Sequence, residues 1–393
     1  TLFKKNFYTY TQKQASLLVL LGIYIMFIKN IDKEVILKPL QIIIGIVEKK
    51  QTLPILSNIL IEKEFDKIRF TATDLEIQIT TTTTLENTEN ELSAITINGK
   101  KFQEILRVLP DKSKISIDNK DNKIEVKANK SRFNLQTLPA QDFPKLNNQL
   151  VDTKVFKLKQ STLKTLLQSV QYAMAQQDVR YYLNGLLLII EGNKLKVVAT
   201  DGHRLAFNLA EIEGNYDKQE IILPRKAITE LCKLLADIDD LVELTFSQQQ
   251  IKADFSGITL ISKIIEGKFP DYERVIPKHN NHLNLNKLLI QQALQRAAIL
   301  SNEKFRGVRF VLTEKNLSII SNNSEQEEAQ EDIETDYHGE SIDIGFNVNY
   351  LLEGLSNITG EEIKISFGDP NSSILITTPN NIELRYVVMP MRI

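Results

Sequence analysis

The chain has 393 residues, of which 42% are hydrophobic and 25% are charged, as in ordinary soluble globular proteins. At about 100–150 residues per domain this length predicts two or three domains, and 15 glycines with 11 prolines exclude collagen-like and low-complexity chains. The 48 Lys and Arg nearly balance the 50 Asp and Glu, so a polyanion site requires segregated charge rather than net charge.

The first 25 residues differ from the rest of the chain. Residues 15–28 form an apolar run of 14, preceded by Lys4, Lys5 and Lys13. A spanning helix needs about 20 such residues, and no small-residue cleavage pattern follows. We interpret residues 1–25 as an N-terminal extension before Met26. A membrane-targeting segment and an additional structural element are the alternatives.

An internal repeat runs through the remaining sequence. The apolar helical spacing i, i+3, i+4, i+7 recurs at a constant interval of 127, at Ile36, Pro39, Leu40 and Ile43, then Leu163, Leu166, Leu167 and Val170, then Ile290, Ala293, Leu294 and Ala297. A second helical set recurs at intervals of 126 and 120, at Phe102, Ile105, Leu106 and Leu109, then Ile228, Leu231, Cys232 and Leu235, then Val348, Leu351, Leu352 and Leu355. We expect Pro39 in the first turn of its helix, where proline is tolerated.

The stretches between these helices alternate and are rich in Ile, Val and Thr, which predicts antiparallel strands. Asp118-Asn119 and residues 191–193 are the expected turns between them. Two helices and several strands per copy give an α+β domain. The repeat therefore predicts three copies of one domain, at residues 26–152, 153–280 and 281–393.

Catalytic and metal-binding motifs are missing from the sequence: it has no GxGxxG, Walker loop, HExxH or CxxC. His203, beside Asp201, is the best catalytic candidate by residue type, but no motif supplies a nucleophile, so a binding or structural role is favoured. Asp201 and its counterpart Asp74 are interpreted as turn-forming residues. His279 and His282 could pair on a metal, although a solvated linker is the simpler interpretation. No cofactor or metal is predicted.

Cys232 is the single cysteine, which excludes intramolecular disulfides and Cys-based zinc sites. It occupies an apolar position of a predicted helix, so we expect a buried, inert thiol. The composition fits a reduced, cytoplasmic compartment.

Opposite charges mark the two ends of the repeat array. Lys127, Lys130 and Arg132 lie in the first copy, and an acidic run with Glu325, Glu327, Glu328, Glu331 and Asp332 lies in the last. This asymmetry predicts head-to-tail association, which can close a ring. Basic residues on the helices could then contact phosphates without reading bases, unless they are only solvated helix faces: Lys38, Lys49, Lys50, Lys100, Lys101, Arg107, Lys164, Arg225, Lys226, Lys233, Lys287 and Arg296.

Five segments are specific enough to identify a family: QQDVRYYLNG at 176–185, ATDGHRLA at 199–206, FPDY at 269–272, AILSNEKFRGVR at 298–309 and YVVMPMRI at 386–393. Over residues 26–393 the chain resembles the bacterial DNA sliding clamp, the beta subunit of replicative DNA polymerase III. The resemblance implies three similar domains per chain and a head-to-tail homodimer that forms a six-domain ring around duplex DNA. It implies no catalysis, only tethering of the polymerase, which raises its effective concentration at the template.

The resemblance also assigns residues. It implies a hydrophobic peptide-binding cleft formed by Leu183, Thr200, Gly202, His203, Arg204, Leu205, Pro270, Arg274, Val275, Val387, Met389, Pro390, Met391 and Arg392. It implies DNA contacts by Lys50, Gln177, Tyr181 and Tyr182, although core packing of the tyrosines is the alternative. It implies a dimer seam with Phe133 and Leu135 against Ile299 and Leu300, and with Lys101 and Arg132 against Glu327 and Glu328.

The implied partners are double-stranded DNA, the polymerase III alpha subunit, the clamp loader, and other polymerases, mismatch-repair and ligase-type proteins that carry clamp-binding peptides. Three features depart from the family: the N-terminal extension, Ile393 in place of a terminal Leu, and Asn371 where an apolar cleft residue is expected. The alternative functions are a hydrolase that uses His203 and Asp201, and a purely structural oligomer that does not bind DNA.

Overall fold

The computed structural model describes residues 26–47, 53–85, 92–120, 123–147, 150 and 153–392. The chain falls into two compact units, Thr1–Lys154 with Leu244–Ser262, and Val155–Glu243 with Lys263–Ile393. The predicted extension at 1–25, together with Lys49, Lys50 and Ile393, lies outside the described residues. Within those residues, no helix has the length and apolar character needed to cross a membrane.

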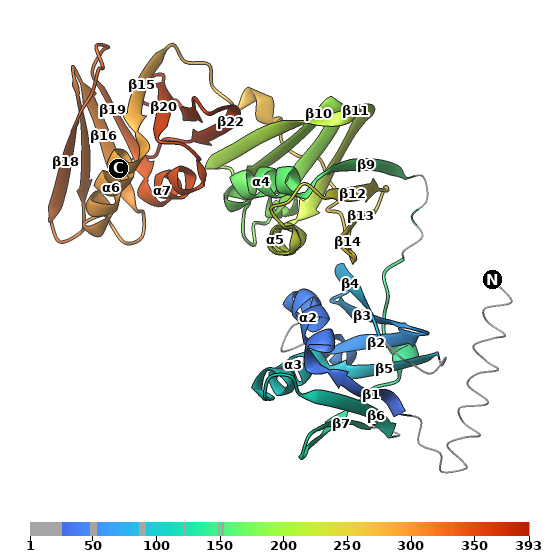
Figure 1. Cartoon of the computed structure of the whole chain (residues 1–393). Coiled ribbons are helices and arrows are strands. Elements are labelled where there is room, and N and C mark those ends of the chain that lie inside the picture. The colour runs from blue at the N-terminus through green and yellow to red at the C-terminus, as the bar shows by residue number, and fades with distance from the viewer. Residues whose placement is uncertain are drawn as a thin grey trace. The chain divides into compact units, whose positions relative to one another are not determined.

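Six α-helices appear in the described part of the chain (Figure 1): α2 (Lys33–Ile43), α3 (Gly99–Val108), α4 (Gln160–Val170), α5 (Arg225–Leu234), α6 (Lys287–Ile299) and α7 (Val348–Asn357). Each of them coincides with one of the six predicted apolar helical sets. The apolar spacing was therefore sufficient to locate every one of these helices, because each set forms the face that packs on a sheet.

The strands of the first half are β1 (Met26–Asp32), β2 (Asn58–Glu64), β3 (Lys67–Thr73), β4 (Ile77–Thr84), β5 (Ser93–Asn98), β6 (Lys114–Lys120), β7 (Lys123–Ala128), β8 (Ser131–Gln136), β9 (Lys154–Lys159), β10 (Gly185–Thr200) and β11 (Arg204–Pro224). Those of the second half are β12 (Leu241–Phe246), β13 (Gln250–Phe255), β14 (Ile258–Lys263), β15 (Asn281–Asn286), β16 (Gly307–Thr313), β17 (Asn316–Asn322), β18 (Glu328–Glu334), β19 (Ile342–Asn347), β20 (Glu362–Phe367), β21 (Ile374–Thr378) and β22 (Asn381–Val388).

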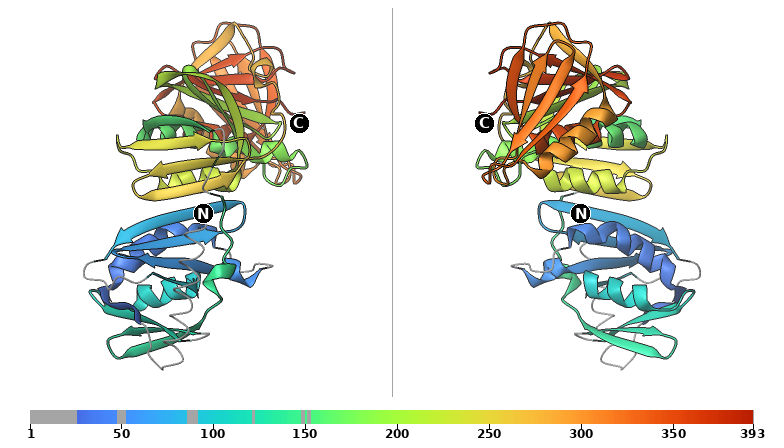
Figure 2. Two further views of the ribbon diagram at one scale, coloured as in Figure 1. Left: turned by 90° about the vertical axis from the view of Figure 1, so that its right-hand side faces the viewer. Right: turned by 90° about the vertical axis from the view of Figure 1, so that its left-hand side faces the viewer.

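In the first unit, α2 and α3 lie side by side against the sheets (Figure 2). Ile36 and Leu40 of α2 and Phe102 and Leu106 of α3 are fully buried. Asn98 begins α3 by accepting a hydrogen bond from the Lys101 amide at 3.0 Å, which satisfies one donor of the first turn. One sheet has the order β1-β6-β7-β8, and the other runs β5-β2-β3-β4 and continues into β14 and β13.

The second unit contains a six-stranded sheet of order β10-β11-β22-β21-β20-β15 and a four-stranded sheet of order β18-β17-β16-β19. Helices α4 and α5 pack together, as do α6 and α7. Gly354 of α7 lies directly under Tyr386 of β22, where a Cβ atom would come within 2.1 Å of the tyrosine ring. Glycine at this position thus allows α7 to approach the sheet closely.

One kind of connection occurs twice in the chain: an antiparallel pairing between strands that belong to successive copies of the repeat. We call each such pairing a joint, the first between β4 and β14 and the second between β11 and β22. In the first unit β4 pairs with β14, and Thr80 lies opposite Thr259. In the second unit β11 pairs with β22, and Phe207 lies opposite Arg385. The paired residues are 179 positions apart at the first joint and 178 positions apart at the second, so the two joints connect strands at nearly the same spacing along the chain. The repeat seen in the sequence is therefore also a repeat of sheet connections.

Each of the two four-stranded sheets has, at one edge, a strand that corresponds to a joint-forming strand elsewhere in the chain. β8 closes the sheet β1-β6-β7-β8, and β18 closes the sheet β18-β17-β16-β19. β8 corresponds to β14, because the two strands begin at Ser131 and Ile258, one repeat interval apart. β18 corresponds to β4, because it follows β16 and β17 as β4 follows β2 and β3. β8 and β18 are therefore the counterparts of joint-forming strands, and within the described residues each is paired on one side only. Free edges of this kind are templates for pairing with another chain.

Three local predictions were wrong. Pro39 is the seventh residue of α2 rather than part of its first turn, since the helix begins at Lys33. Asp118 and Asn119 lie within β6, opposite Glu125 and Ile124, instead of forming a turn. The expected turn at 191–193 is a register shift inside the continuous strand β10, with Gly192 at φ +61°. Turn-type residues marked a bulge there, because a bulge needs the same positive φ.

Candidate functional site

A buried apolar cluster lies at the second joint, on β10, β11, β22 and the segment that follows β14. We call it the junction cluster; it consists of Leu187, Ile189, Val198, Leu205, Phe207, Ile222, Phe269, Tyr272 and Val387. The rings of Phe207 and Tyr272 stack at 5.7 Å between centroids. Strand pairing places Leu205 opposite Val387, so residues from the second and third repeats form one continuous surface.

The turn between β10 and β11 is built by Asp201. Its carboxylate accepts hydrogen bonds from the amides of His203 at 2.9 Å and Arg204 at 3.0 Å. Gly202 has φ +88°, which a residue with a side chain rarely adopts. Asp74 caps the equivalent turn of the first repeat, accepting from Glu76 at 2.9 Å and Ile77 at 2.8 Å. The interpretation of both aspartates as turn-forming residues is confirmed.

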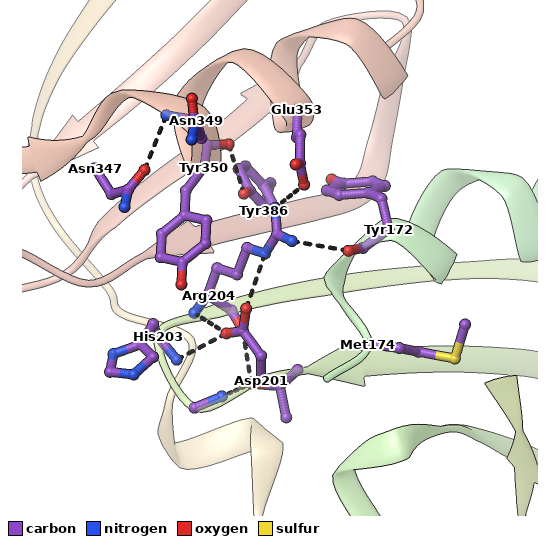
Figure 3. A network of polar contacts seen from close by, with 12 residues as sticks. Tyr172, Met174, Asp201, His203, Arg204, Asn347, Asn349, Tyr350, Glu353 and Tyr386 are labelled. Atoms are coloured by element: carbon purple, nitrogen blue, oxygen red, sulfur yellow. Dashed lines mark hydrogen bonds and ion pairs between the residues drawn. The ribbon is translucent and has the colours of Figure 1, made fainter. Parts of the chain in front are cut away.

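Arg204 is the centre of a polar network between β11 and α7 (Figure 3). Its guanidinium donates to Asp201 Oδ2 at 3.1 Å, to the Tyr172 carbonyl at 2.9 Å and to Glu353 on α7. It also lies 4.6 Å from the centroid of the Tyr350 ring. Arg204 is only 7% exposed, so this buried charge depends on its partners to compensate for lost hydration.

The C-terminal residues after β22 lie beside this network. The Met389 amide donates to the His203 carbonyl at 2.9 Å, and the Met391 amide donates to the Gly345 carbonyl at 2.8 Å. Met389 is 43% exposed although Val387, two residues earlier, is fully buried. The tail therefore presents apolar side chains at the rim of the junction cluster. Met side chains suit such a surface because they adapt to different ligands.

Two backbone hydrogen bonds and one strand pair therefore bring together many of the predicted peptide-binding residues. Thr200, Gly202, His203, Arg204 and Leu205 share the β10–β11 turn, which contacts the tail. Leu183 is buried, with its carbonyl accepting from the Ala175 amide. Pro270, Arg274 and Val275 flank Tyr272 of the junction cluster; Val275 is 43% exposed, and Arg274 pairs with Asp271 at 2.8 Å. Pro390 and Met391 are half-buried and Arg392 is exposed.

Sequence reasoning missed the contribution of α7. The Tyr350 ring stacks on the His203 ring at 6.4 Å with an interplanar angle of 17°, and Glu353 pairs with Arg204. A cavity of about 290 Å³ opens between Tyr350, His203 and Arg204 on one side and residues 174–176 with Asp178 on the other. The signal available was the helical period of α7, which leaves Tyr350 and Glu353 off the buried stripe.

The loop before β10 carries the predicted DNA-contacting residues. Asp178 and Arg180 form a bidentate pair at 2.9 and 3.0 Å, and hydrogen bonds with Arg180 lower the pKa of Asp178 to about 2. Asn184 braces the loop through two hydrogen bonds to Asp178 at 2.9 Å. Tyr181 is 58% exposed, so core packing does not account for it. Tyr182 is half-buried against the junction cluster, and Gln177 is exposed.

The predicted seam residues lie on the two free-edge strands and beside them. Phe133 and Leu135 are half-buried on β8, opposite the fully buried Val126 and Ile124. Ile299, at the end of α6, is 76% exposed, while Leu300 is half-buried. Helix α6 is fixed to β18 by a bidentate pair between Arg296 and Glu331 at 2.8 and 2.6 Å. Lys101, Glu327 and Glu328 are exposed.

The basic residues of the first repeat have an intramolecular partner that the sequence did not reveal. Glu125 is 3% exposed and receives Lys127 at 2.8 Å, Lys120 at 2.9 Å and Arg132 at 3.2 Å. The hydrogen bonds from Lys127 and Lys120 lower the pKa of Glu125 to about 2. Arg132 remains 63% exposed in its side chain, so it is available at the surface in spite of this contact.

The predicted helix cations differ in availability. Arg225 donates to the Met174 carbonyl at 2.8 Å, Lys287 to the Ile358 carbonyl at 2.8 Å, and Lys233 pairs with Glu230 at 2.7 Å. Lys38, Lys101 and Arg107 are exposed, whereas Lys100 and Lys164 are half-buried. The helices of the first repeat therefore present more of these cations at the surface than α6, whose two basic side chains are held within the chain.

The remaining chemical candidates are structural. Cys232 is buried, which raises the pKa of its thiol to about 12. His279 bonds to the Ser373 carbonyl at 2.9 Å, and His282 lies in β15 rather than in a linker. No cluster of three or more metal-ligating side chains occurs among the described residues. The His203 ring packs on the Tyr350 ring.

Replacing Arg204 by Gln is expected to lower the free energy of unfolding of the second unit by about 2–3 kcal/mol, measured in urea. The change removes the guanidinium donor from the Glu353 carboxylate, from Asp201 Oδ2 and from the Tyr172 carbonyl. The cost of breaking a buried pair is discounted because Glu353 is half-exposed. Arg309→Gln, which breaks the exposed pair with Asp343, is the matched control and should change stability by less than about 1 kcal/mol. Equal effects of the two variants would contradict the central role of Arg204.

Known proteins resemble this chain over most of its length. Three consecutive family descriptions match it: DNA polymerase III beta subunit, N-terminal domain at 26–147, central domain at 157–271 and C-terminal domain at 273–392. The beta sliding clamp of Pseudomonas putida is 45% identical over 367 residues, covering 93% of this chain and 99% of that protein. The beta sliding clamp of Escherichia coli is 41% identical over 365 residues, with the same coverage of 93% and 99%.

Solved structures show the same similarity. A crystal structure of the DNA polymerase sliding clamp from Pseudomonas aeruginosa with ligand has a TM-score of 0.89 at 43% identity, covering 94% of this chain and 100% of that one. A sliding clamp from the same organism bound to griselimycin gives the same four values. The beta sliding clamp of Caulobacter crescentus has a TM-score of 0.88 at 36% identity, covering 94% and 99%.

Proposed function

The chain belongs to the DNA polymerase III beta subunit family, the beta sliding clamps, and on this premise we propose that it is a processivity factor that encircles duplex DNA. Its three clamp domains carry the boundaries 26–152, 153–280 and 281–393. It has no catalytic activity of its own. The observation that carries the proposal is the twofold repetition of the strand joint, which leaves β8 and β18 as complementary free edges.

A head-to-tail homodimer would satisfy both free edges. If β18 of one chain pairs with β8 of its partner, the third joint repeats the two that each chain already contains. Phe133 and Leu135 would then meet the exposed end of α6, at Ile299 and Leu300. Arg132 and Lys101 would face Glu327 and Glu328. Such an interface closes after two chains, giving a six-domain ring.

The junction cluster and its rim form the site for short peptides of partner proteins. The floor is apolar, and Met389, Val275 and Tyr350 surround it with adaptable or aromatic side chains. We assign the polymerase III alpha subunit, the clamp loader, other polymerases, and mismatch-repair and ligase-type proteins to this site. Asn371 donates its amide to Asp369, which places it in a turn and leaves no apolar contribution from it to the cleft.

DNA binding is assigned to Gln177, Tyr181 and Tyr182, and to Lys50. The rigid Asp178–Arg180 pair holds the exposed Tyr181 on the loop, where its ring can stack on bases or pack on sugars. Phosphate contacts made without base readout allow sliding. We place this activity in the cytoplasm, where replication of a bacterial chromosome occurs.

The proposed function predicts topological binding. The chain, loaded by a clamp loader onto nicked circular duplex DNA, should comigrate with that DNA in gel filtration at high salt and be released when the circle is linearised. A ring held by encirclement resists salt, whereas contacts with phosphates alone weaken steeply with it. Failure to remain on circular DNA would support the structural oligomer instead. Hydrolysis that is lost in His203→Ala while peptide binding is kept would revive the hydrolase.

A further inference from the structure

The first unit contains a polar cavity of about 370 Å³ at the joint between β4 and β14. It occupies the position that the junction cluster occupies at the second joint. By the repeat interval, Ile189, Val198, Leu205, Phe207 and Leu209 correspond to Glu62, Thr71, Gln78, Thr80 and Thr82, all of which line the cavity. The two joints thus share a backbone but have opposite surface chemistry.

The polar lining is held in place by hydrogen bonds. Gln78 accepts the Leu146 amide at 2.9 Å, and the hydroxyls of Thr71 and Thr80 lie 3.2 Å apart. Phe143 and Leu146, on this face, correspond to Phe269 and Tyr272 at the second joint, because the offset is 126 for both pairs. A chain segment therefore borders the cavity at the first joint, as another segment borders the junction cluster at the second. The cavity remains an open polar groove.

Three cations converge on the cavity, and each has a carboxylate nearby. Lys145 contacts Glu62 at 2.7 Å, and Lys252 contacts Asp254 at 2.7 Å. Arg69 lies 4.0 Å from Glu62 and 4.0 Å from Glu64, which is too far for a hydrogen bond. Its side chain is 47% exposed, so its donors are available to a ligand at the mouth of the cavity.

We infer that this cavity is a second peptide-docking site, which takes an extended partner segment with acidic side chains. The inference rests on the proposed function in one respect, that the equivalent second joint binds peptides. A planar guanidinium matches a carboxylate through two hydrogen bonds, and Lys252 with the Thr80 and Thr82 hydroxyls can complete its coordination. Apolar peptides are disfavoured, because they would desolvate Glu62 and Gln78 without replacing their hydrogen bonds.

The test measures binding of a fluorescein-labelled peptide of alternating glutamate and serine to the full chain by fluorescence anisotropy. Saturable binding is expected, and Arg69→Gln with Lys252→Gln should weaken it about tenfold, the effect of losing charge-assisted hydrogen bonds. Thr80→Phe, which introduces the residue of the second joint, should block it by filling the cavity. Lys196→Gln is the matched control: it is the counterpart of Arg69 in the second repeat, pairs with Glu191 at 3.1 Å, and should leave the affinity unchanged.

Binding that does not saturate, or that is equally weakened by Lys196→Gln, would overturn the inference. Displacement of the peptide by millimolar inorganic phosphate would assign the cavity to a free oxyanion and would also overturn it. An apolar clamp-binding peptide, measured on the same samples, separates the two proposals. If it binds while the acidic peptide does not, only this inference fails; if it does not bind, the proposed function of the second joint fails.

Discussion

Removal of residues 389–393 is expected to abolish binding of a polymerase-derived peptide while the chain remains dimeric. Met389 and Met391 are anchored through their amides to His203 and Gly345. The exposed Met389 and the half-buried Met391 supply apolar surface at the rim of the junction cluster. Residues that dominate the energy of an interface contribute about 2 kcal/mol or more each, and we expect the two methionines to be of this kind, so the loss should exceed about 30-fold. Neither free-edge strand includes the tail, and the dimer should therefore survive.

The measurement combines peptide binding by fluorescence anisotropy with sedimentation velocity on the same preparation. Met389→Ala with Met391→Ala should reproduce most of the affinity loss with the backbone hydrogen bonds intact. Ile382→Ala is the matched control, because this residue lies near the start of β22, the strand that leads into the tail, and is 76% exposed, yet it lies outside the junction cluster. A deletion product that is monomeric would contradict the assignment of the tail to the cleft alone.

The sequence was sufficient to locate the helices and the repeat, because both depend on apolar spacing. Ile36 and Leu40, Leu163 and Leu167, and Ile290 and Leu294 are all buried at the positions that the period requires. The turn predictions failed where the same residue type is compatible with two local structures. Gly192 satisfies a positive φ in a bulge as readily as in a turn, and Asp118 fits inside β6 because Lys127, on the neighbouring strand, pairs with it at 2.7 Å.

The candidate site could be predicted only in part, for a similar reason. The turn residues from Thr200 to Leu205 are contiguous, and their common location follows from the chain itself. The pairing of Arg204 with Glu353 joins residues 149 positions apart, and no period or spacing encodes it. The same holds for Glu125: a carboxylate surrounded by three cations cannot be told from a solvated one until the strands β6, β7 and β8 are placed side by side.

Alanine at both Ile299 and Leu300 is expected to convert the dimer into monomers at micromolar concentration. Ile299, at the end of α6, is 76% exposed and is the most exposed apolar side chain of that helix. A large apolar side chain in that position indicates a surface buried on association. Truncating the two side chains removes about 3 kcal/mol or more of apolar burial, which raises the dissociation constant at least about 100-fold. The folded monomer should persist, because neither residue belongs to the buried core of α6.

Leu288→Ala with Leu289→Ala is the matched control for this experiment. Both residues are on α6 and exposed, at 59% and 47%, but they lie at its beginning, whereas β8 of the partner would meet its end. Sedimentation equilibrium should give a dimer for this control and a monomer for the Ile299 and Leu300 variant. A second test uses the free edge of β8 itself. The pairs Ala128–Ser131, Val126–Phe133 and Ile124–Leu135 alternate with pairs whose backbone groups face outward. Asn134→Pro therefore removes an outward donor and should weaken pairing with β18. An unchanged dimer in both variants would show that the third joint is not built like the first two.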